Sequence, residues 1–484
     1  MTIRVQANHK YIDEIQSMVQ IFFPHARFGS DSTPEYIVVS TIENGKIHAK
    51  ILPSSRHREE RSRACRERSV AEAIQHFGKH TITSDNYPTI PSKRLAMLAM
   101  YRLLQSTIGA YTPWGALTGV RPTKMVREWL ANGQSETEIL RTLQSTFHVT
   151  KSRADLALTV AQAENRLTAQ IKDTGLYVSI PFCPSRCVYC SFNTSSGQWS
   201  EAAQILYITA LISELRKLTT TLNETGSKIS SIYIGGGTPT ALTDTQLEAL
   251  LSAIQEVVPV PKEYTIEAGR PDTITRENLQ LMRKYGANRI SINPQTLNEN
   301  TLKIIGRNHT TTDFLRAYNQ AREEGFTTIN TDIIAGLPYE TPKDTLQTME
   351  TLANLNPENI TVHTLAVKRA SKLNEQRLES KTYTKPAAEI IESQLKIAHE
   401  ACNTMGHSPY YLYRQKNMAA LFENTGYSLP GHECLYNIGM MSEVQTVLGV
   451  GAGAVSKYIE GTKITRKFNV KNPEIYINRA MPVT

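Results

Sequence analysis

The feature that most constrains the fold is an alternation of short β-branched runs with longer amphipathic segments, which begins at Gly175. The short runs indicate buried strands, and the segments between them are long enough to form helices. The six expected strands are LYVSIPF from Leu176, SIYIGGG from Ser231, EYTIEAG from Glu263, RISINPQ from Arg289, TINTDII from Thr328 and NITVHTLAV from Asn359. Because consecutive parallel strands need crossover connections of this length, the pattern predicts a parallel β/α arrangement.

Six such units make an incomplete barrel, so the expected fold class is α/β with a partial (β/α)6 TIM-like barrel. At 484 residues the chain is too long for one core. We expect an N-terminal α/β plus helical extension and a C-terminal cap domain. The four predicted domains are a small α/β domain at 1–91, a helical connector at 92–174, the barrel at 175–367 and the cap at 368–484.

Two local signals support the predicted N-terminal segments. The runs YIVVSTI and KIHAKIL flank the turn Glu43-Asn44-Gly45, which is typical of a β-hairpin. In the helical connector, Ser135 and Glu138 have the spacing of a capping box.

Hydropathy excludes a membrane-spanning class for this sequence. The most apolar C-terminal stretch, Val447 to Val455, is far shorter than the roughly 20 residues that cross a bilayer. The opening MTIRVQANHKYIDEI has no apolar core of the kind found in signal peptides. We therefore expect a cytoplasmic protein without a membrane span.

The charge balance favours no particular partner. There are 53 Lys and Arg against 45 Asp and Glu, a net charge of +8 that would suit nucleic acid or a small polyanion. The densest basic run, Arg56 to Arg68, is interleaved with Glu59, Glu60 and Glu67, which favours a solvated helix face. A nucleic-acid partner is kept only as a minor alternative.

Three of the six cysteines form a cluster, Cys183, Cys187 and Cys190, with the spacing C-x3-C-x2-C at the end of the first barrel strand. Three thiolates can bind three irons of a cubane and leave the fourth iron open to another ligand. Zinc or a chance spacing is the alternative, but structural zinc needs four ligands, and His309 and His363 are remote in sequence. The other three cysteines are interpreted as isolated thiols: Cys65, Cys402 and Cys434.

Glycines and polar residues follow the next strands of the predicted barrel. The run Gly235 to Pro239 would let a backbone loop approach a ligand closely, although a plain turn is the alternative. Glu267, Gln295 and Asp332 end three successive strands, where barrel enzymes build their sites. Each alone is more typical of a helix cap or a surface residue, but three together favour a ligand pocket. Arg307 is a candidate carboxylate ligand, with a surface ion pair as the alternative.

These segments resemble a known family. YVSIPFCPSRCVYCSF, IYIGGGTPT, the strand-end Glu267, RISINPQ and TDIIAGLPYET resemble the oxygen-independent coproporphyrinogen III dehydrogenase (oxidase) family of radical S-adenosylmethionine (SAM) proteins in order and spacing. The similarity covers roughly Gly175 to Ala366, with a fainter echo in VLGVGAGAVSKY. The N-terminal extension, LTGVRPTK and PGHECLYN resemble the HemZ-type branch of that family.

The resemblance implies the cofactors and the reaction. It implies a [4Fe-4S] cluster on Cys183, Cys187 and Cys190, with SAM bound to the open iron. An electron from the cluster, supplied by a donor such as flavodoxin or ferredoxin, would cleave SAM to a 5′-deoxyadenosyl radical. The implied reaction is oxidative decarboxylation of two propionates of coproporphyrinogen III, which yields protoporphyrinogen IX.

The resemblance also implies site residues, with Tyr177 and Glu267 as the catalytic candidates. One SAM would be contacted by Tyr177, Gly236, Gly237, Thr238, Glu267, Gln295, Arg307 and Asp332. Tyr189 and Ala366 match positions that contact a second SAM in the best-known enzyme of the family.

One departure from the family pattern keeps an alternative function open. The best-known enzyme has a fourth cysteine where this chain has Phe192, and Ser191-Phe192 instead resembles the haem-chaperone branch. That branch binds and transfers haem without decarboxylation, although its His-Asn-Phe-Tyr motif is not evident here. The partner is therefore expected to be a tetrapyrrole, either coproporphyrinogen III or haem. The candidate propionate ligands are Arg270, Arg307, Lys368 and Arg369.

Overall fold

A computed structural model describes most of the chain. The described residues are 2–23, 26–28, 34–53, 79–86, 90–109, 112–117, 119, 121–190, 199–259, 261–368, 371–373, 375, 386–415, 418, 421–461 and 463–480. Several features named above lie outside them: Cys65, the whole basic run Arg56 to Arg68, the pair Ser191-Phe192 and Arg369.

The chain forms two compact units, Met1–Leu158 and Thr159–Thr484. The first contains a five-stranded sheet in the order β2-β1-β3-β4-β5, in which β1 is parallel to β2 and β3 and the other pairs are antiparallel. Its main elements are β1 (Thr2–Ala7), α1 (Ile12–Phe22), β2 (Arg27–Phe28), β3 (Tyr36–Glu43), β4 (Lys46–Pro53), β5 (Lys79–Thr83), α4 (Ser92–Ile108), α5 (Thr123–Ala131) and α6 (Glu136–Arg141).

The two local predictions for this unit are confirmed. Strands β3 and β4 pair antiparallel up to Glu43 and Lys46, and Asn44 and Gly45 between them both have positive φ, as a two-residue hairpin turn requires. The hydroxyl of Ser135 accepts from the amide of Glu138, whose carboxylate accepts from the amide of Ser135, so the capping box forms at the start of α6.

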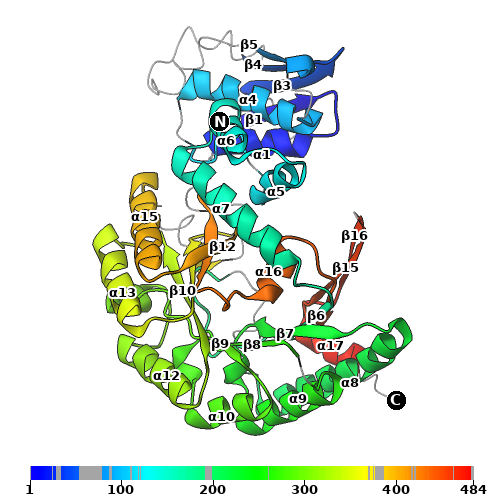
Figure 1. The fold of residues 1–484 in the computed structure, drawn as a ribbon, viewed down its shortest axis with the longest axis vertical. Coiled ribbons are helices and arrows are strands. Elements are labelled where there is room, and N and C mark those ends of the chain that lie inside the picture. Colours follow the sequence, from blue (N-terminus) through cyan, green and yellow to red (C-terminus); the bar gives the residue numbers. More distant parts are fainter. Residues whose placement is uncertain are drawn as a thin grey trace. The chain divides into compact units, whose positions relative to one another are not determined.

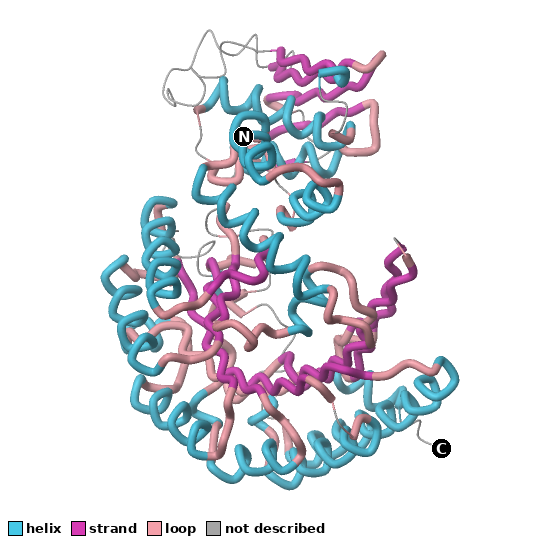
Figure 2. Tube along the Cα trace, viewed as in Figure 1, coloured by secondary structure: helices cyan, strands magenta, loops and turns pink. Residues whose placement is uncertain are grey.

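The second unit is built on one curved sheet, with helices covering its convex side (Figures 1 and 2). The strand order is β12-β13-β11-β10-β9-β8-β7-β6-β14-β15-β16. The strands from β6 to β11 pair in parallel, each with the next, so all six predicted strands and the partial barrel are confirmed. Their bounds are β6 (Thr174–Ile180), β7 (Ile229–Gly236), β8 (Glu263–Glu267), β9 (Arg289–Ser291), β10 (Thr328–Ala335) and β11 (Asn359–Thr364).

The C-terminal segment extends the same sheet on both sides. Strand β14 is parallel to β6, while β13 is antiparallel to β11, so strands distant in sequence flank the six-stranded core. These added strands are β12 (Ser408–Tyr413), β13 (Asn424–Ser428), β14 (Val447–Val450), β15 (Val455–Glu460) and β16 (Lys463–Phe468). The four-domain division stays a prediction, and these strands belong structurally to the barrel sheet.

The helices of this unit lie mostly between successive strands. They are α8 (Glu201–Thr225), α9 (Asp244–Val257), α10 (Arg276–Lys284), α11 (Glu299–Ile304), α12 (Thr311–Glu323), α13 (Pro342–Leu355), α15 (Ala388–Thr404), α16 (Leu435–Met441) and α17 (Pro473–Ala480), while α7 (Lys151–Thr168) crosses the boundary between the two units. Within the described residues, no helix is long and apolar enough to cross a membrane.

The period of two along each strand separates the hydrophobic core from the barrel interior. On β7 and β8, Ile232, Ile234 and Ile266 are fully buried in the core beneath the helices, whereas Tyr233 and Glu267 line an interior cavity. On β10 and β11 the core residues are Ile329, Ile333, Ile360 and Val362, whereas Asn330, Asp332, Thr361 and His363 line the cavity. The fold therefore supplies a polar interior because every second strand residue must face it.

Candidate active site

The loop after β6 holds the three clustered cysteines near one another. Cys187 is buried, and Cys183 and Cys190 are half-buried. The amide of Cys190 donates to the carbonyl of Cys187 at 3.1 Å, and the amide of Val188 donates to the carbonyl of Ile305 at 3.0 Å. The loop is thus held both by its own turn and by the segment that follows α11.

The glycine run at the end of β7 packs directly against the start of this loop. The amides of Gly237 and Thr238 donate to the carbonyls of Ile180 and Phe182 at 2.6 and 2.7 Å. A Cβ on Gly237 would lie 2.3 Å from the carbonyl oxygen of Phe182, so only glycine fits there. These two amides therefore hold the cysteine loop in place, and contact of the glycine run with a ligand stays a prediction.

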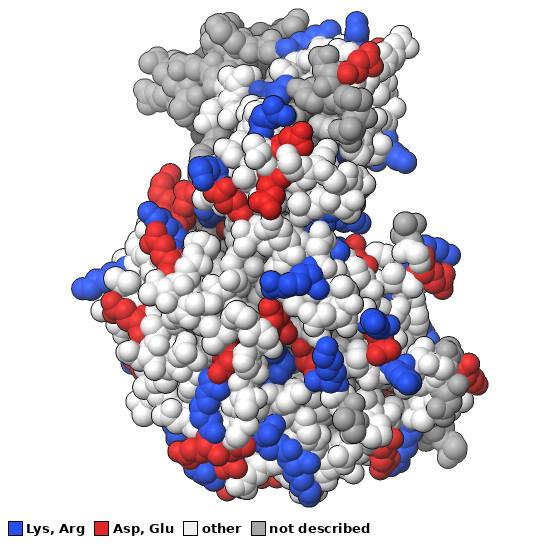
Figure 3. All heavy atoms as spheres, in the orientation of Figure 1, with Lys and Arg blue, Asp and Glu red and all other residues white. Residues whose placement is uncertain are grey.

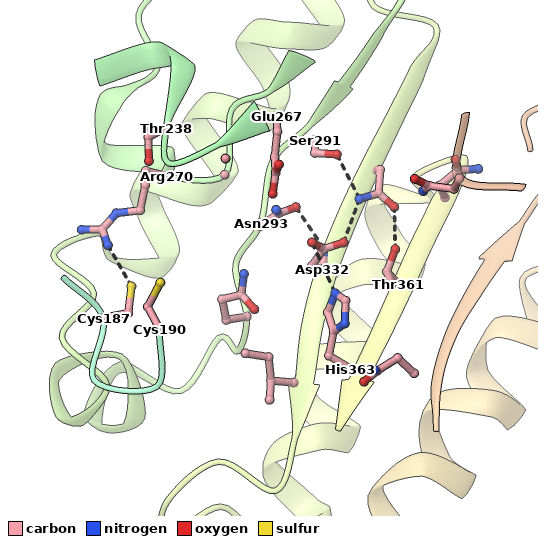
Figure 4. Close-up of a pocket in the computed structure, with 18 of the residues that line it drawn as sticks. Cys187, Cys190, Thr238, Glu267, Arg270, Ser291, Asn293, Asp332, Thr361 and His363 are labelled. Atoms are coloured by element: carbon pink, nitrogen blue, oxygen red, sulfur yellow. Dashed lines mark hydrogen bonds and ion pairs between the residues drawn. The ribbon is translucent and has the colours of Figure 1, made fainter. Parts of the chain in front are cut away.

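The hydroxyl of Thr238 connects the glycine run after β7 to the cysteine loop after β6. Its Oγ1 lies 3.4 Å from Sγ of Cys183. Cys187 receives a stronger contact, because Nη1 of Arg270 donates to its Sγ at 3.1 Å (Figure 4). Both cysteines consequently face hydrogen-bond donors from neighbouring strand ends.

The cysteine loop and the strand ends open into one cavity of about 370 Å³. It falls within the usual size range of small-molecule sites, about 300–1,000 Å³. In Figure 4, Cys187 and Cys190 lie on one side of it, with Asp332, Thr361 and His363 across from them. Twelve residues predicted from the sequence line this cavity: Cys183, Cys187, Cys190, Tyr189, Gly236, Gly237, Thr238, Glu267, Gln295, Arg307, Asp332 and Ala366.

Tyr177 is the predicted site residue that does not line the cavity. Its ring stacks with Tyr233 and Tyr436 at centroid distances of 6.3 and 6.4 Å, and Tyr233 is itself a lining residue. Tyr177 therefore lies behind the cavity wall, and its catalytic role stays a prediction.

Arg307 is fixed by its neighbours at the cysteine end. Its Nη1 donates to the carbonyl of Gly269 at 2.6 Å, and its Nη2 donates to the hydroxyl of Tyr189 at 3.1 Å.

Gln295 has a positive φ of 65°, uncommon for a residue other than glycine, and its amide donates to the carbonyl of Asp332. Unusual backbone of this kind concentrates at ligand sites, which favours a binding role for Gln295.

The carboxylate of Asp332 on β10 is held by one residue of its own strand and by one residue of the next strand, β11. Nδ2 of Asn330 donates to its Oδ1 at 2.8 Å, and Nε2 of His363 lies 3.5 Å from its Oδ2. Burial acts to raise the pKa of Asp332, but His363, Asn330 and Thr361 outweigh it and hold the pKa below its ordinary value. Asp332 is therefore an ionised acceptor with a fixed orientation.

Glu267, at the end of β8, behaves in the opposite way. Burial, followed by the negative charge of Asp332, raises the pKa of Glu267 to about 7, against weaker opposing effects of His363, the Gly236 amide and Tyr233. Two carboxylates with pKa values moved apart in one cavity can serve as a proton donor and an acceptor.

We expect Glu267→Gln to change how the stability of the metal-free protein depends on pH. The folded-state pKa of Glu267, about 7, lies above its ordinary value of 4.5, so the folded state binds the proton more tightly. This contribution is fully present below pH 4.5 and is lost as the pH rises to about 7. The free energy of unfolding should therefore fall by up to about 3 kcal/mol across that interval in the parent protein. Glutamine does not titrate, so the variant should not show this fall. Urea unfolding at pH 5 and pH 8 measures it. An equal pH dependence in Glu267→Gln and in the exposed control Glu277→Gln would contradict the assignment.

Several lining residues were missed by the sequence analysis. They come from β12, β13 and the segment around α16, and they include Tyr410, Tyr411, Tyr413, Asn424, Cys434, Asn437 and Met441. The tyrosine repeat at 410, 411 and 413 was a visible signal, but its position beside the barrel depended on β12 and β13 joining the sheet. Asn330 and His363 also line the cavity. Asn330 lies two residues before Asp332 on β10, and His363 lies on the next strand, β11.

The residues around the cysteines suit an iron–sulfur cubane better than a single ion. Among the described residues, no three His, Cys, Asp or Glu side chains converge closely enough to bind one metal ion. In a cubane each thiolate binds a different iron, so the three sulfurs need not converge on one point. The donor set is three soft thiolates beside the buried guanidinium of Arg270, which offsets their negative charge. The loop therefore fits a [4Fe-4S] group.

The barrel of parallel strands and the three-cysteine loop after its first strand both indicate a radical SAM protein, and the comparisons agree. Residues 177–352 match the Radical SAM superfamily. The oxygen-independent coproporphyrinogen-III oxidase-like protein HemZ of Bacillus subtilis (strain 168) is 39% identical over 388 residues, which cover 78% of this chain and 76% of HemZ. The chain belongs to the oxygen-independent coproporphyrinogen III oxidase family of radical SAM proteins, in its HemZ-like branch, as its sequence motifs predicted.

Two further similarities bear on fold and function. The heme chaperone HemW of Bacillus subtilis (strain 168) is 30% identical over 300 residues, which cover 61% of this chain and 74% of HemW. Among solved structures, coproporphyrinogen III oxidase (HemN) from Escherichia coli aligns with a TM-score of 0.52 and 24% identity, over 66% of this chain and 72% of that one. The second match supports the barrel fold.

Proposed function

We propose that this protein is a cytoplasmic radical SAM enzyme that converts coproporphyrinogen III to protoporphyrinogen IX without oxygen. Family membership and the similarity to HemZ support a role in tetrapyrrole chemistry. The observation that carries the proposal is the single cavity into which the cysteine loop and the polar ends of β7, β8 and β10 all open. A low-potential donor such as flavodoxin or ferredoxin would supply electrons.

In this proposal Cys183, Cys187 and Cys190 hold the [4Fe-4S] cluster, and SAM binds beside it. When bound, the two together would supply one-electron cleavage of SAM and abstraction of a hydrogen atom from the substrate. The SAM ligands would be the cavity residues of the glycine loop and strand ends: Gly236, Gly237, Thr238, Glu267, Gln295, Arg307 and Asp332. Tyr189 and Ala366 would contact a second SAM.

The protein's own side chains would bind and orient the reactants. Asp332, held by Asn330 and His363, would accept hydrogen bonds from ribose hydroxyls, and protonated Glu267 could donate one. Lys368 lines the cavity beyond the end of β11, and its ammonium would attract a propionate of the substrate. Removal of a hydrogen atom from the propionate β-carbon, with loss of CO2 and transfer of one electron to an external acceptor, would give each vinyl group.

Anaerobic turnover tests the proposal. The protein, reconstituted with iron and sulfide, is given SAM, dithionite and coproporphyrinogen III, and products are separated after oxidation. We expect protoporphyrin and 5′-deoxyadenosine together, both dependent on SAM. Formation of 5′-deoxyadenosine without a vinyl product would contradict the substrate and leave the radical SAM chemistry standing.

Haem binding on the same scaffold is the second candidate, because the similarity to HemW favours it. Haem titration of the reconstituted protein distinguishes the two functions. A stable complex with a shifted Soret band and no vinyl product would favour a haem chaperone, whereas product without stable haem binding would favour the enzyme.

Nucleic acid has less support as a partner. On the face of the Thr159–Thr484 unit in Figure 3, Lys and Arg side chains are interspersed with Asp and Glu. This face of the unit therefore shows a mixed surface and no single-sign patch of the kind that attracts a polyanion.

A further inference from the structure

The contact between Arg270 and Cys187 is not used by the proposed reaction. Arg270 follows β8 through Ala268 and Gly269, and it is 3% exposed. Its Nη1 donates to Sγ of Cys187 at 3.1 Å, and its Nη2 donates to Oγ of Ser185 at 2.6 Å. Both terminal nitrogens of the guanidinium are therefore directed at the cysteine loop, not at a propionate as the sequence suggested.

The local backbone fixes Arg270 in this position. Its carbonyl accepts from the amide and the hydroxyl of Thr273 at 2.9 and 2.8 Å, within the short turn that follows it. The guanidinium Nε lies 3.4 Å from Oδ1 of Asp272, whose side chain is 20% exposed. One carboxylate thus faces the cation on the side away from the sulfur.

A buried cation beside a cluster thiolate affects the oxidised and reduced cluster differently. Reduction adds one electron and therefore one negative charge to a group already carrying thiolate charge. Because electrostatic interactions are strong where water is excluded, the cation stabilises the reduced form more than the oxidised form. Hydrogen bonds to the sulfurs and local charge are the protein's usual means of setting cluster potentials.

We propose that Arg270 is a positioning residue that raises the reduction potential of the [4Fe-4S] cluster through its hydrogen bond to Cys187. The inference rests on the cluster of the proposed function and does not depend on the tetrapyrrole substrate. Arg270 acts through the ligand Cys187 and does not need to touch SAM or substrate. Asp272 opposes it by offsetting part of its charge.

An anaerobic redox titration of the full-length reconstituted protein tests the proposal. The reduced cluster is followed by electron paramagnetic resonance while dithionite and mediators set the potential, with neither SAM nor tetrapyrrole present. Arg270→Gln keeps a donor and removes the charge, so its potential should shift to a more negative value. Arg270→Lys keeps the charge and loses the two-pronged geometry, so its shift should be smaller.

Two companion variants separate tuning from a purely structural role. Asp272→Asn should shift the potential in the opposite direction, to a more positive value, because the charge of Arg270 is then less offset. Arg276→Gln, an exposed arginine paired with Glu324 at 2.7 Å, should leave the potential unchanged. A structural role would lower the iron content of the Arg270 variants without moving the potential of the clusters that form.

The outcomes test the role of Arg270 and the proposed substrate separately. Equal potentials in the parent, Arg270→Gln and Asp272→Asn proteins, at equal iron and sulfide content, would overturn the inference. If Arg270→Gln does not take up a cluster, Arg270→Lys and Asp272→Asn decide by the direction of their shifts. Shifted potentials in a protein that forms no vinyl product would support the role of Arg270 while contradicting the proposed substrate.

Discussion

Replacing Cys187 with alanine should abolish the [4Fe-4S] cluster and lower SAM cleavage by at least about 100-fold, because even outer partners of a metal site are worth about 10–100-fold. Cys187 is the buried member of the triad and the one that accepts a hydrogen bond from Arg270. Its loss removes one of three protein ligands and leaves a buried guanidinium without its sulfur partner.

Iron and sulfide analysis, the visible absorption of the cubane and the yield of 5′-deoxyadenosine measure this effect. Cys402→Ala is the matched control, since Cys402 is also buried but lies on α15 within the core. A cubane spectrum and unchanged SAM cleavage in Cys187→Ala would remove the cluster assignment and everything built on it.

Replacing Glu263 with alanine should destabilise the Thr159–Thr484 unit by about 3–5 kcal/mol, the usual cost of breaking a buried charged network. Glu263 starts β8 and is 5% exposed. Its two carboxylate oxygens accept from the amides of Leu435 and Tyr436 at 2.7 and 2.9 Å, which caps the first turn of α16. The change would leave the half-buried amide of Leu435 and the buried amide of Tyr436 unpaired, and the nearby charge of Arg289 would lose the carboxylate beside it.

Urea unfolding of the full chain measures the loss, and hydrogen exchange at Leu435 and Tyr436 gives a local readout. Exposed Glu277 in the first turn of α10 provides the control, and Glu277→Ala should cost less than about 0.5 kcal/mol. Unchanged exchange at α16 in Glu263→Ala would show that the carboxylate does not hold that helix.

Local periodicity was enough to identify the barrel strands. Runs such as TINTDII carry buried β-branched residues on one parity and polar residues on the other, and this pattern does not depend on distant contacts. The cysteine spacing was equally informative, because all three cysteines lie within one short loop. Twelve of the predicted site residues share a cavity because parallel strands bring their carboxyl ends to one edge of the sheet.

The C-terminal segment could not be placed in this way. Strand β14 lies beside β6 although some 270 residues separate Val447 from Gly175, and no local pattern encodes such a pairing. PGHECLYN was visible as a branch motif, but its contact with Glu263 joins residues more than 170 positions apart and depends on the tertiary fold. The roles of Tyr410, Tyr411 and Tyr413 in the cavity wall follow from the same long-range pairing.

The sequence alone thus determined the strands, the cluster loop and the family, since each is written in residues near one another along the chain. Only the tertiary structure decided where the charges act. Arg270 could have faced solvent or a propionate, and burial beside Cys187 directed it to the sulfur. Glu267 and Asp332 are both strand-end carboxylates in sequence, and only their packing moved the pKa of one up and the other down. Burial and distance set these energies, and neither can be read from a residue's neighbours in the chain.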